Sequence, residues 1–160
     1  MTGTYFIDDL SVAQRTAATE WATALAEGRW AETTGVLRRR DAFTGVVAYC
    51  CLGAACDLFN PELWDLRDGH GHAPVDRYPT KEEGSPVRFV QADLPYNVRD
   101  HYGLRSIDGM PNDSAMLALV SLNDNGFGHP FIGRLLLAEL GGSTTEMLRD
   151  MIAARQAEIR

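Results

Sequence analysis

Apolar residues recur at helical spacing near the start of the chain, directly after a capping signal. Ser11 is followed three residues later by Gln14, which is the capping-box arrangement that begins helices. Trp21 and the apolar residues around it then share one helical face, among alanines that favour helix. Gly28 can adopt the left-handed conformation that ends a helix. The pattern predicts a helix over residues 11–27.

Two short apolar runs follow, at residues 35–37 and 45–50, and a polar connection separates them. Such a pair of runs predicts a β-hairpin. The second run leads directly into residues 51–59, whose apolar positions take the helical period, and Pro61 closes this segment. We therefore expect a strand followed at once by a buried helix.

Residues 60–93 contain several prolines and glycines and show no sustained period. A long irregular loop within a compact domain is usually functional or disordered. Within it, residues 87–90 could form one edge strand. We interpret residues 60–93 as an irregular loop insertion.

Four more helices are expected, over residues 94–102, from 112 or 113 to 122, over 131–140, and from 143 towards residue 160. Asp93 is the expected cap of the first, and Pro130 fits the opening position of the third. Ser143 and Glu146 form a second capping box. Together these elements predict an α+β fold: one mainly helical domain over residues 1–160, with a small antiparallel hairpin sheet.

Composition narrows the class of protein. The chain has 160 residues, is 45% hydrophobic and 23% charged, and carries a net charge of −7. This composition is that of an ordinary globular protein. The acidic balance argues against binding to extended nucleic acid. The first ten residues lack the positive charge and the apolar run of a signal peptide, and no stretch could span a membrane. We expect a cytoplasmic protein of the host cell.

Three cysteines lie within seven residues, at Cys50, Cys51 and Cys56. An odd, clustered set indicates reduced thiols rather than a disulfide framework. Cys51 lies near the predicted strand-to-helix junction, where a thiolate would be stabilised as a nucleophile. The spacing does not match a zinc motif. The simplest interpretation is three small buried apolar residues.

The only dense positive patch contains Arg38 and Arg40, which strand alternation places on one face, with Arg39 on the other. Two guanidinium groups on one face could hold a phosphate or a carboxylate. A solvated hairpin end that pairs with Asp41 is the alternative. Tyr49 and Trp64 could stack a ring, and Trp64 is the tryptophan that we expect to be most exposed, whereas Trp21 belongs to the core.

Familiar enzyme signatures are absent from the sequence, including phosphate-binding loops, nucleophile elbows and metalloprotease motifs. His70 and His72 could reach one cation, but a solvated loop is the simpler interpretation. The segment from Ser121 to Gly126 lacks the carboxylates of a calcium loop. We expect no cofactor and no bound metal.

The order of motifs resembles a family of small uncharacterised proteins from tailed phages, prophages and actinobacterial genomes. The resemblance is carried by WxxxLxxG at 21–28, GVLR at 35–38, YCCLGAACDL at 49–58, LPxxVxxxYGL at 94–104 and LxxLNDxGxxHxFI at 119–132. The stretch at 49–58 is the most specific of these. The resemblance implies an accessory protein of a phage or mobile element, and it supplies no catalytic residues. The 60–93 insertion and the final helix depart from the family pattern.

The leading hypothesis is a protein that binds without turnover. Its target would be a small anionic or nucleotide-like host defence signal, or a host protein. The candidate ligand-binding residues are Arg38, Arg40, Tyr49, Trp64, Asn123 and Asp124. Two alternatives stay open: a cysteine-dependent enzyme with Cys51 as nucleophile, and a protein-interaction module that uses the acidic surface and the 60–93 loop. Both the binding protein and the protein-interaction module are compatible with an oligomer.

Overall fold

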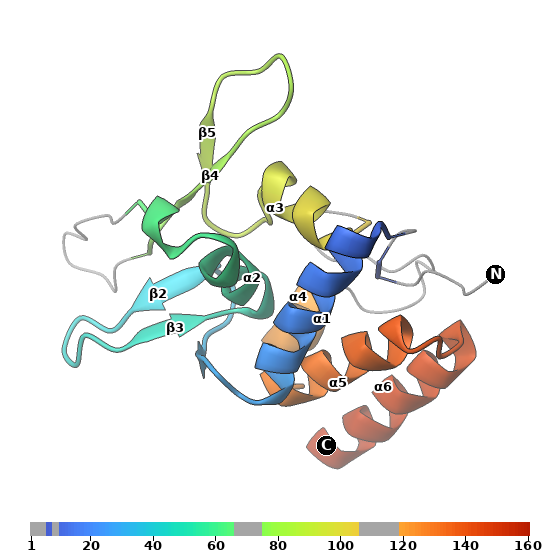
Figure 1. Ribbon diagram of the computed structural model, residues 1–160. Coiled ribbons are helices and arrows are strands. Elements are labelled where there is room, and N and C mark those ends of the chain that lie inside the picture. Colours follow the sequence, from blue (N-terminus) through green and yellow to red (C-terminus); the bar gives the residue numbers. More distant parts are fainter. Residues whose placement is uncertain (1–5, 8–9, 66–74, 106–118) are drawn as a thin grey trace.

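The computed structural model describes residues 6–7, 10–65, 75–105 and 119–160, and its fold is α+β, as predicted. The helices are α1 (Val12–Ala26), α2 (Cys51–Phe59), α3 (Tyr96–Tyr102), α4 (Leu119–Asp124), α5 (His129–Leu140) and α6 (Thr145–Ile159), with a short 3-10 turn η1 (Pro61–Leu63). The strands are β1 (Ala31–Glu32), β2 (Arg38–Arg40), β3 (Val47–Tyr49), β4 (Tyr78–Thr80) and β5 (Arg88–Val90). Figure 1 shows the helices gathered on one side and two β-hairpins extending from the other.

Helix α1 begins and ends where the sequence predicts. The Ser11 side chain accepts a hydrogen bond from the Gln14 backbone, and the Gln14 side chain bonds back to the backbone of Ser11. Gly28 follows the helix with φ of +68°, in the left-handed region. Helix α1 packs closely on α5, because Gly133 has no Cβ to separate the two backbones. These two helices form the centre of the helical layer.

The predicted hairpin is confirmed as β2 and β3, which pair antiparallel with Arg39 opposite Ala48. A third strand, β1, pairs parallel with β3, so the strand order is β1-β3-β2. Sequence pattern did not reveal β1 because it has only two residues, too few to establish a period. Strand β3 leads into α2 as expected, with Cys50 as the N-cap residue.

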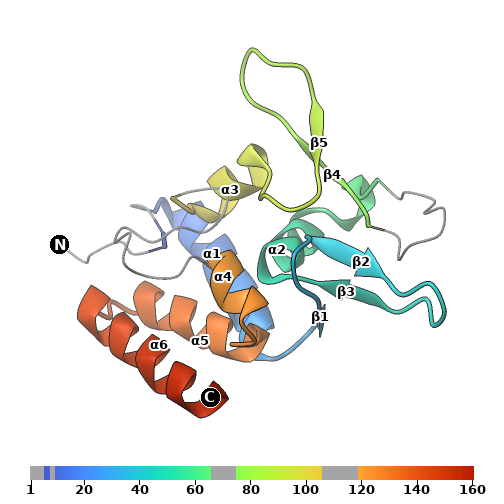
Figure 2. The same ribbon diagram turned by 180° about the vertical axis from the view of Figure 1, so that it is seen from behind.

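Part of the 60–93 segment is more ordered than the predicted irregular loop. Strands β4 and β5 pair antiparallel, with Tyr78 opposite Val90, and β5 confirms the expected edge strand. We call residues 78–90 the β4–β5 arm. Figures 1 and 2 show the arm projecting away from the helices in both views.

Three helix starts differ from the prediction. Pro95 precedes α3 in place of the expected Asp93 cap, and the first backbone N–H of α3 donates to the Thr80 side chain of the arm. Helix α6 is capped by Thr144, one residue later than predicted, because its hydroxyl accepts from the backbone of Met147. Pro130 is the second residue of α5 rather than the first. The start expected at residue 112 or 113 lies outside the described residues.

The core lies between α1, α2, α3 and α5, and Trp21 is fully buried there, as predicted. Its indole N–H donates to the Cys51 carbonyl at 3.2 Å, which ties α1 to the start of α2. Among the described residues, no helix combines the length and the apolar character needed to cross a lipid bilayer.

Candidate binding site

Four of the six predicted ligand-binding residues come together at the base of the β2–β3 hairpin. Arg38 and Arg40 extend from β2, Tyr49 ends β3, and Trp64 follows η1. Their contacts with three further residues define a group that we call the aromatic–arginine cluster, which comprises Trp30, Arg38, Arg40, Tyr49, Asp57, Trp64 and Asp76. Four of the seven members are residues that the sequence proposes for ligand binding, and that role stays a prediction.

Arg38 lies against two aromatic rings. Its guanidinium carbon is 5.0 Å from the centre of the Trp64 ring and 5.6 Å from the centre of the Tyr49 ring. A cation over an aromatic face is attracted by the ring quadrupole, more strongly when water is excluded. The Arg38 side chain is 12% exposed, so much of it is desolvated.

The anion that Arg38 and Arg40 share is the carboxylate of Asp76. The Arg38 Nε atom lies 2.9 Å from the Asp76 Oδ2 atom, and the Arg40 Nη2 atom lies 3.9 Å from the same oxygen. Asp76 is 1% exposed. Alternation along β2 thus placed both arginines on one face as predicted, but the chain itself fills the anion position between them.

Asp41, the partner expected for these arginines, has another role. Its carboxylate accepts hydrogen bonds from the backbone N–H groups of Phe43 and Thr44, at 2.9 and 2.7 Å. These backbone bonds, that from Thr44 first, lower the pKa of Asp41. Asp41 therefore stabilises the hairpin turn. It does not pair with Arg38 and Arg40, so the alternative predicted from the sequence is wrong.

Asp57, on α2, receives three hydrogen bonds from aromatic side chains. The indole N–H of Trp30 donates to Oδ2 at 3.0 Å, while the Tyr49 hydroxyl and the Trp64 indole both donate to Oδ1 at 3.2 Å. Partial burial, followed by the charge of Asp57, raises the pKa of Tyr49. Trp64 is only 8% exposed, contrary to expectation, because its ring also packs on Tyr78.

The cluster is balanced in charge and internally bonded. Arg38 and Arg40 face Asp76, and three aromatic donors share the Asp57 carboxylate. Such a network rigidifies the base of the hairpin. The sequence did not indicate that Asp57 and Asp76 belong to this cluster. Asp57 lies on α2 and Asp76 lies just before β4, and no fixed spacing in the sequence links either aspartate to the arginines of β2.

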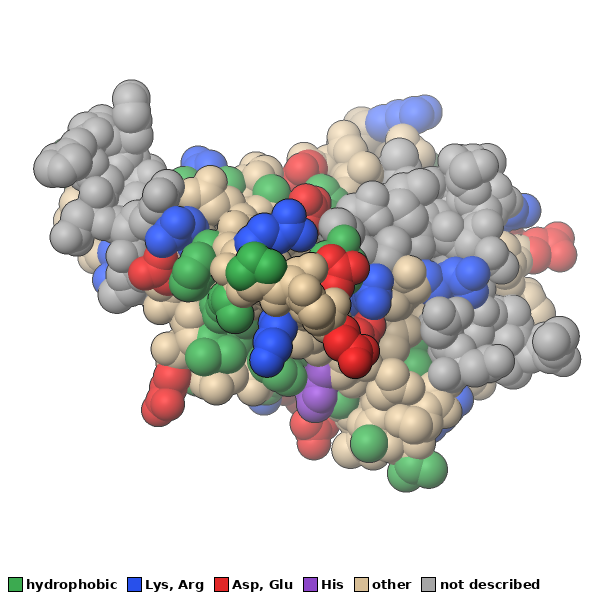
Figure 3. All heavy atoms as spheres, turned by 90° about the horizontal axis from the view of Figure 1, so that it is seen from above, with side chains coloured by type: hydrophobic (Ala, Val, Ile, Leu, Met, Phe, Trp, Pro, Cys, Tyr) green, Lys and Arg blue, Asp and Glu red, His purple; other side chains and the backbone are tan. Residues whose placement is uncertain are grey.

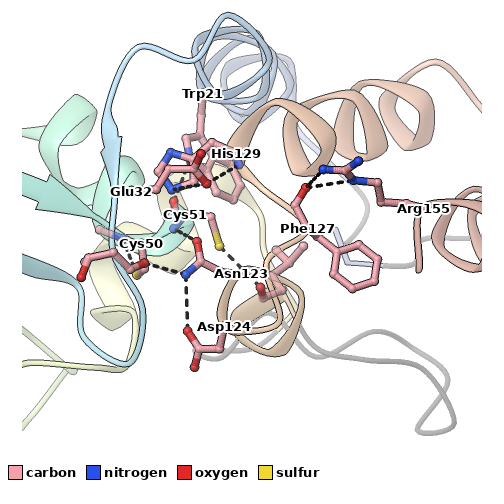
Figure 4. Close-up of polar contacts among 12 residues, drawn as sticks. Trp21, Glu32, Cys50, Cys51, Asn123, Asp124, Phe127, His129 and Arg155 are labelled. Atoms are coloured by element: carbon pink, nitrogen blue, oxygen red, sulfur yellow. Dashed lines mark hydrogen bonds and ion pairs between the residues drawn. The ribbon is translucent and has the colours of Figure 1, made fainter. Parts of the chain in front are cut away.

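The other two predicted residues bind backbone groups elsewhere, and Figure 4 shows Asn123 beside the start of α2. Asn123 accepts from the Cys51 N–H at 3.0 Å and donates to the Thr33 carbonyl at 2.8 Å. Asp124 accepts from the Gly35 N–H at 3.0 Å. These contacts join α4 to the start of α2 and to the segment between β1 and β2, so both side chains position backbone.

The cysteines are buried, as the simplest interpretation predicted. Burial raises the pKa of Cys50 to about 11 and raises the pKa values of Cys51 and Cys56 well above the ordinary thiol value. The Cys51 thiol donates to the Leu119 carbonyl at 3.6 Å. A thiol that is buried and neutral is a poor nucleophile, so this geometry does not favour Cys51 as a catalytic residue.

His129 is a further buried polar residue that the sequence did not single out. Its backbone N–H donates to the Glu32 carboxylate at 2.7 Å, and its ring Nε2 atom lies 4.0 Å from the same oxygen (Figure 4). Desolvation lowers the pKa of His129 and outweighs the opposing attraction of Glu32. His70 and His72 lie outside the described residues. Within the described part, no three potential metal ligands gather.

Exposed apolar side chains lie away from the cluster. Phe43 at the turn of the β2–β3 hairpin is 98% exposed, while Val87 and Phe89 on the β4–β5 arm are 53% and 46% exposed. Figure 3 looks down on the arm, where hydrophobic, basic and acidic side chains lie next to one another.

No family model, curated protein or solved structure matches this chain. The proposed function therefore rests on the geometry of the exposed hairpin and arm surfaces.

Proposed function

We propose that this chain is a binding protein that captures a protein partner without chemical turnover. The resemblance of its motifs to phage and prophage proteins supports a role as an accessory protein of a phage or mobile element that acts on a host protein. The observation that carries the proposal is the β4–β5 arm, which is anchored in the core and presents apolar side chains to solvent.

The base of the arm is firmly attached. The buried Tyr78 donates its hydroxyl to the carbonyls of Cys56 and Asn60, at 3.1 and 2.8 Å. Thr80 accepts from the first N–H of α3 at 3.0 Å. An anchored arm loses less conformational freedom on binding than a flexible loop, so more of the contact energy contributes to affinity.

The outer part of the arm has the composition of an interface. Residues 81–89 are exposed throughout. The Arg77 guanidinium lies 4.7 Å from the centre of the Phe89 ring. Aromatic and arginine side chains are enriched at protein interfaces, where a small apolar centre is surrounded by polar groups. Val87 and Phe89 supply such a centre, and the neighbouring Lys81, Glu82, Glu83 and Arg88 supply polar surroundings.

A protein partner has more support than a small anion. Asp76 already occupies the position between Arg38 and Arg40 that a phosphate would take. The hydrogen-bonding edges of Trp30, Tyr49 and Trp64 are all directed to Asp57. A nucleotide would have to displace a buried carboxylate and leave it unpaired, which is costly.

Affinity capture from an actinobacterial host extract tests the proposal. Val87→Ser combined with Phe89→Ser removes the apolar centre of the arm, and Val12→Ser, at an exposed valine on α1, is the matched control. We expect the wild type and the control to retain the same host protein and the double variant to lose it. Retention of an identical set of proteins by all three would contradict the proposal.

A further inference from the structure

The two strands of the β4–β5 arm differ in what their outer edges offer. Pro79 of β4 lies opposite Phe89 of β5. Because proline has no N–H, these two residues cannot exchange hydrogen bonds and form a non-hydrogen-bonded pair of the ladder. Their backbone groups therefore point outward, away from the partner strand. The outer edge of β4 lacks a donor at Pro79, whereas the outer edge of β5 presents both the N–H and the C=O of Phe89.

This edge of β5 is open at Phe89. In the part of the chain that the structure describes, the outward N–H and C=O of Phe89 have no hydrogen-bond partner. The residue is 46% exposed. Two residues further along, the Gln91 carbonyl accepts from the Leu37 N–H at 2.6 Å. The chain itself thus supplies a backbone partner just beyond the strand and leaves the position at Phe89 free.

The side chains of β5 define what kind of strand would fit beside it. Val87 and Phe89 share one face by alternation and are 53% and 46% exposed. Arg88 is on the other face, opposite the neutral Thr80, and none of the described residues forms an ion pair with it. A strand added to this edge places one side chain directly across from Arg88, where an opposite charge is favourable. The complement of β5 is therefore an extended segment with apolar side chains on one face and a carboxylate on the other.

We infer that β5 binds an extended, acidic segment of the partner protein as an additional strand, through backbone hydrogen bonds to Phe89 and a carboxylate opposite Arg88. This inference rests on the proposed capture of a partner by the arm, and it adds the conformation and the charge of the captured segment. A helix bonds its own backbone groups and would leave those of Phe89 unpaired. An extended segment satisfies them, and its alternate side chains contact Val87 and Phe89.

Amide hydrogen exchange, followed by NMR, tests the inference on the full chain. The probe is a short blocked synthetic peptide of alternating valine and glutamate, and the same peptide with lysine in place of glutamate is the control. In the free protein the Phe89 amide should exchange fast and the Val90 amide, which the ladder bonds to Tyr78, should exchange slowly. The glutamate peptide at saturation should slow exchange at Phe89 about tenfold or more, and the lysine peptide should bind about tenfold more weakly.

Three results would overturn the inference. The first is unchanged exchange at Phe89 with both peptides, and the second is equal binding of the two peptides. The third is slow exchange at Phe89 in the protein alone that increases with protein concentration, because a second copy of the chain would then occupy the edge.

A proline substitution separates the backbone contact from the side-chain contact. Phe89→Ala removes the ring, and Phe89→Pro removes both the ring and the outward N–H. Because that N–H does not bond to β4, both variants should fold, which circular dichroism checks. The proline variant should bind the glutamate peptide about tenfold more weakly than the alanine variant. Equal affinities would contradict strand addition.

Glu83→Pro is the matched control for the proline substitution. Glu83 is the second residue of the turn at 82–85, in which the Ser85 N–H donates to the Glu82 carbonyl and Gly84 has φ of +79°. Proline is favoured at this position of such a turn, so the variant should bind the glutamate peptide as the wild type does.

The outcomes separate this inference from the proposed function. If the glutamate peptide pairs with β5 and no host protein is captured, the proposed function fails and the strand-binding edge stands. If a host protein is captured through Val87 and Phe89, but Phe89→Pro and Phe89→Ala bind it equally well, strand addition fails and the proposed function stands.

Discussion

Individual buried polar side chains hold separate segments of this molecule together. Asn123 is the clearest case, because its amide bonds both to the first N–H of α2 and to the carbonyl of Thr33. The sequence placed Asn123 among the ligand-binding residues, since a turn signal and a binding residue look alike in sequence. The structure assigns it to backbone positioning.

Asn123→Ala should therefore destabilise the fold. The variant loses two hydrogen bonds and leaves the buried Cys51 N–H without its partner, which together should lower the free energy of unfolding by about 2–4 kcal/mol. Asn125→Ala is the matched control, because Asn125 bonds to Ser121 at the exposed end of the same helix. Urea unfolding of both variants measures the difference, and equal stabilities would refute the positioning role.

His129 should make stability depend on pH. Its ring is fully buried and desolvation lowers its pKa, so the unfolded chain takes up a proton near the ordinary value of about 6.5 while the folded chain does not. The free energy of unfolding should then decrease as pH falls below about 6.5. His129→Gln removes the titration and should flatten this part of the profile. An unchanged slope in the variant would exclude His129 as the source.

The three thiols should react slowly in the native protein. Burial keeps Cys51 protonated, and a disulfide reagent needs both access and a thiolate. Labelling at neutral pH should be far slower than for free cysteine and should become fast in urea. Rapid modification of Cys51 in the folded chain would revive the alternative of a cysteine-dependent enzyme.

At the scale of elements, the packing of α1 on α5 depends on the absence of a side chain at Gly133. A Cβ atom there would lie 2.3 Å from the Ala26 nitrogen and 2.5 Å from the Ala22 carbonyl oxygen. Both are backbone atoms, so the helices would have to move apart. The close approach of these two helices therefore requires glycine at this position.

Gly133→Ala should lower the free energy of unfolding by about 3 kcal/mol or more, because overpacking between two backbones has no side chain to relax. Gly141→Ala, at the end of the same helix, is the control. Its φ of −78° suits alanine, and the effect there should stay below about 1 kcal/mol. Thermal unfolding of the two variants distinguishes them, and similar losses would contradict the close-packing argument.

Elements with strong local signals could be predicted, and those made by distant partners could not. Helix α1 carries its own capping box, and the β2–β3 hairpin has two apolar runs. By contrast, β1 exists because two residues pair with β3, and β4 contains Pro79, which sequence patterns disfavour in strands. The first backbone N–H of α3 donates to the Thr80 side chain of the arm. The residues next to α3 in the sequence therefore carry no signal for its first residue.

Across the whole molecule, contacts between residues far apart in the sequence also determine which groups the candidate arginines bind. Alternation along β2 predicted that Arg38 and Arg40 share a face, and the structure places Tyr49 and Trp64 beside Arg38. Whether the arginines were free depended on Asp76, more than thirty residues away along the chain, which only the fold could place. The cluster is therefore a packed and charge-paired base of the β2–β3 hairpin.

Hydrogen bonds between residues far apart in the sequence also hold the helical side of the molecule together. Glu139 accepts from the Phe6 N–H with both carboxylate oxygens, at 2.9 and 3.2 Å. Arg155 of α6 donates to the Phe127 carbonyl at 3.3 Å (Figure 4). The arm contributes to this body through Tyr78, Thr80 and Val90 at its base, so its outer part can change without loss of the fold.

The most direct test of the proposed function is the affinity of the captured host protein for a chain with a shortened arm. Residues 81–87 are replaced by an Asn-Gly turn, which keeps β4 and β5 paired. Surface plasmon resonance should show that binding is lost, while the unfolding temperature stays within a few degrees of the wild type. Unchanged affinity for the shortened chain would contradict recognition by the arm.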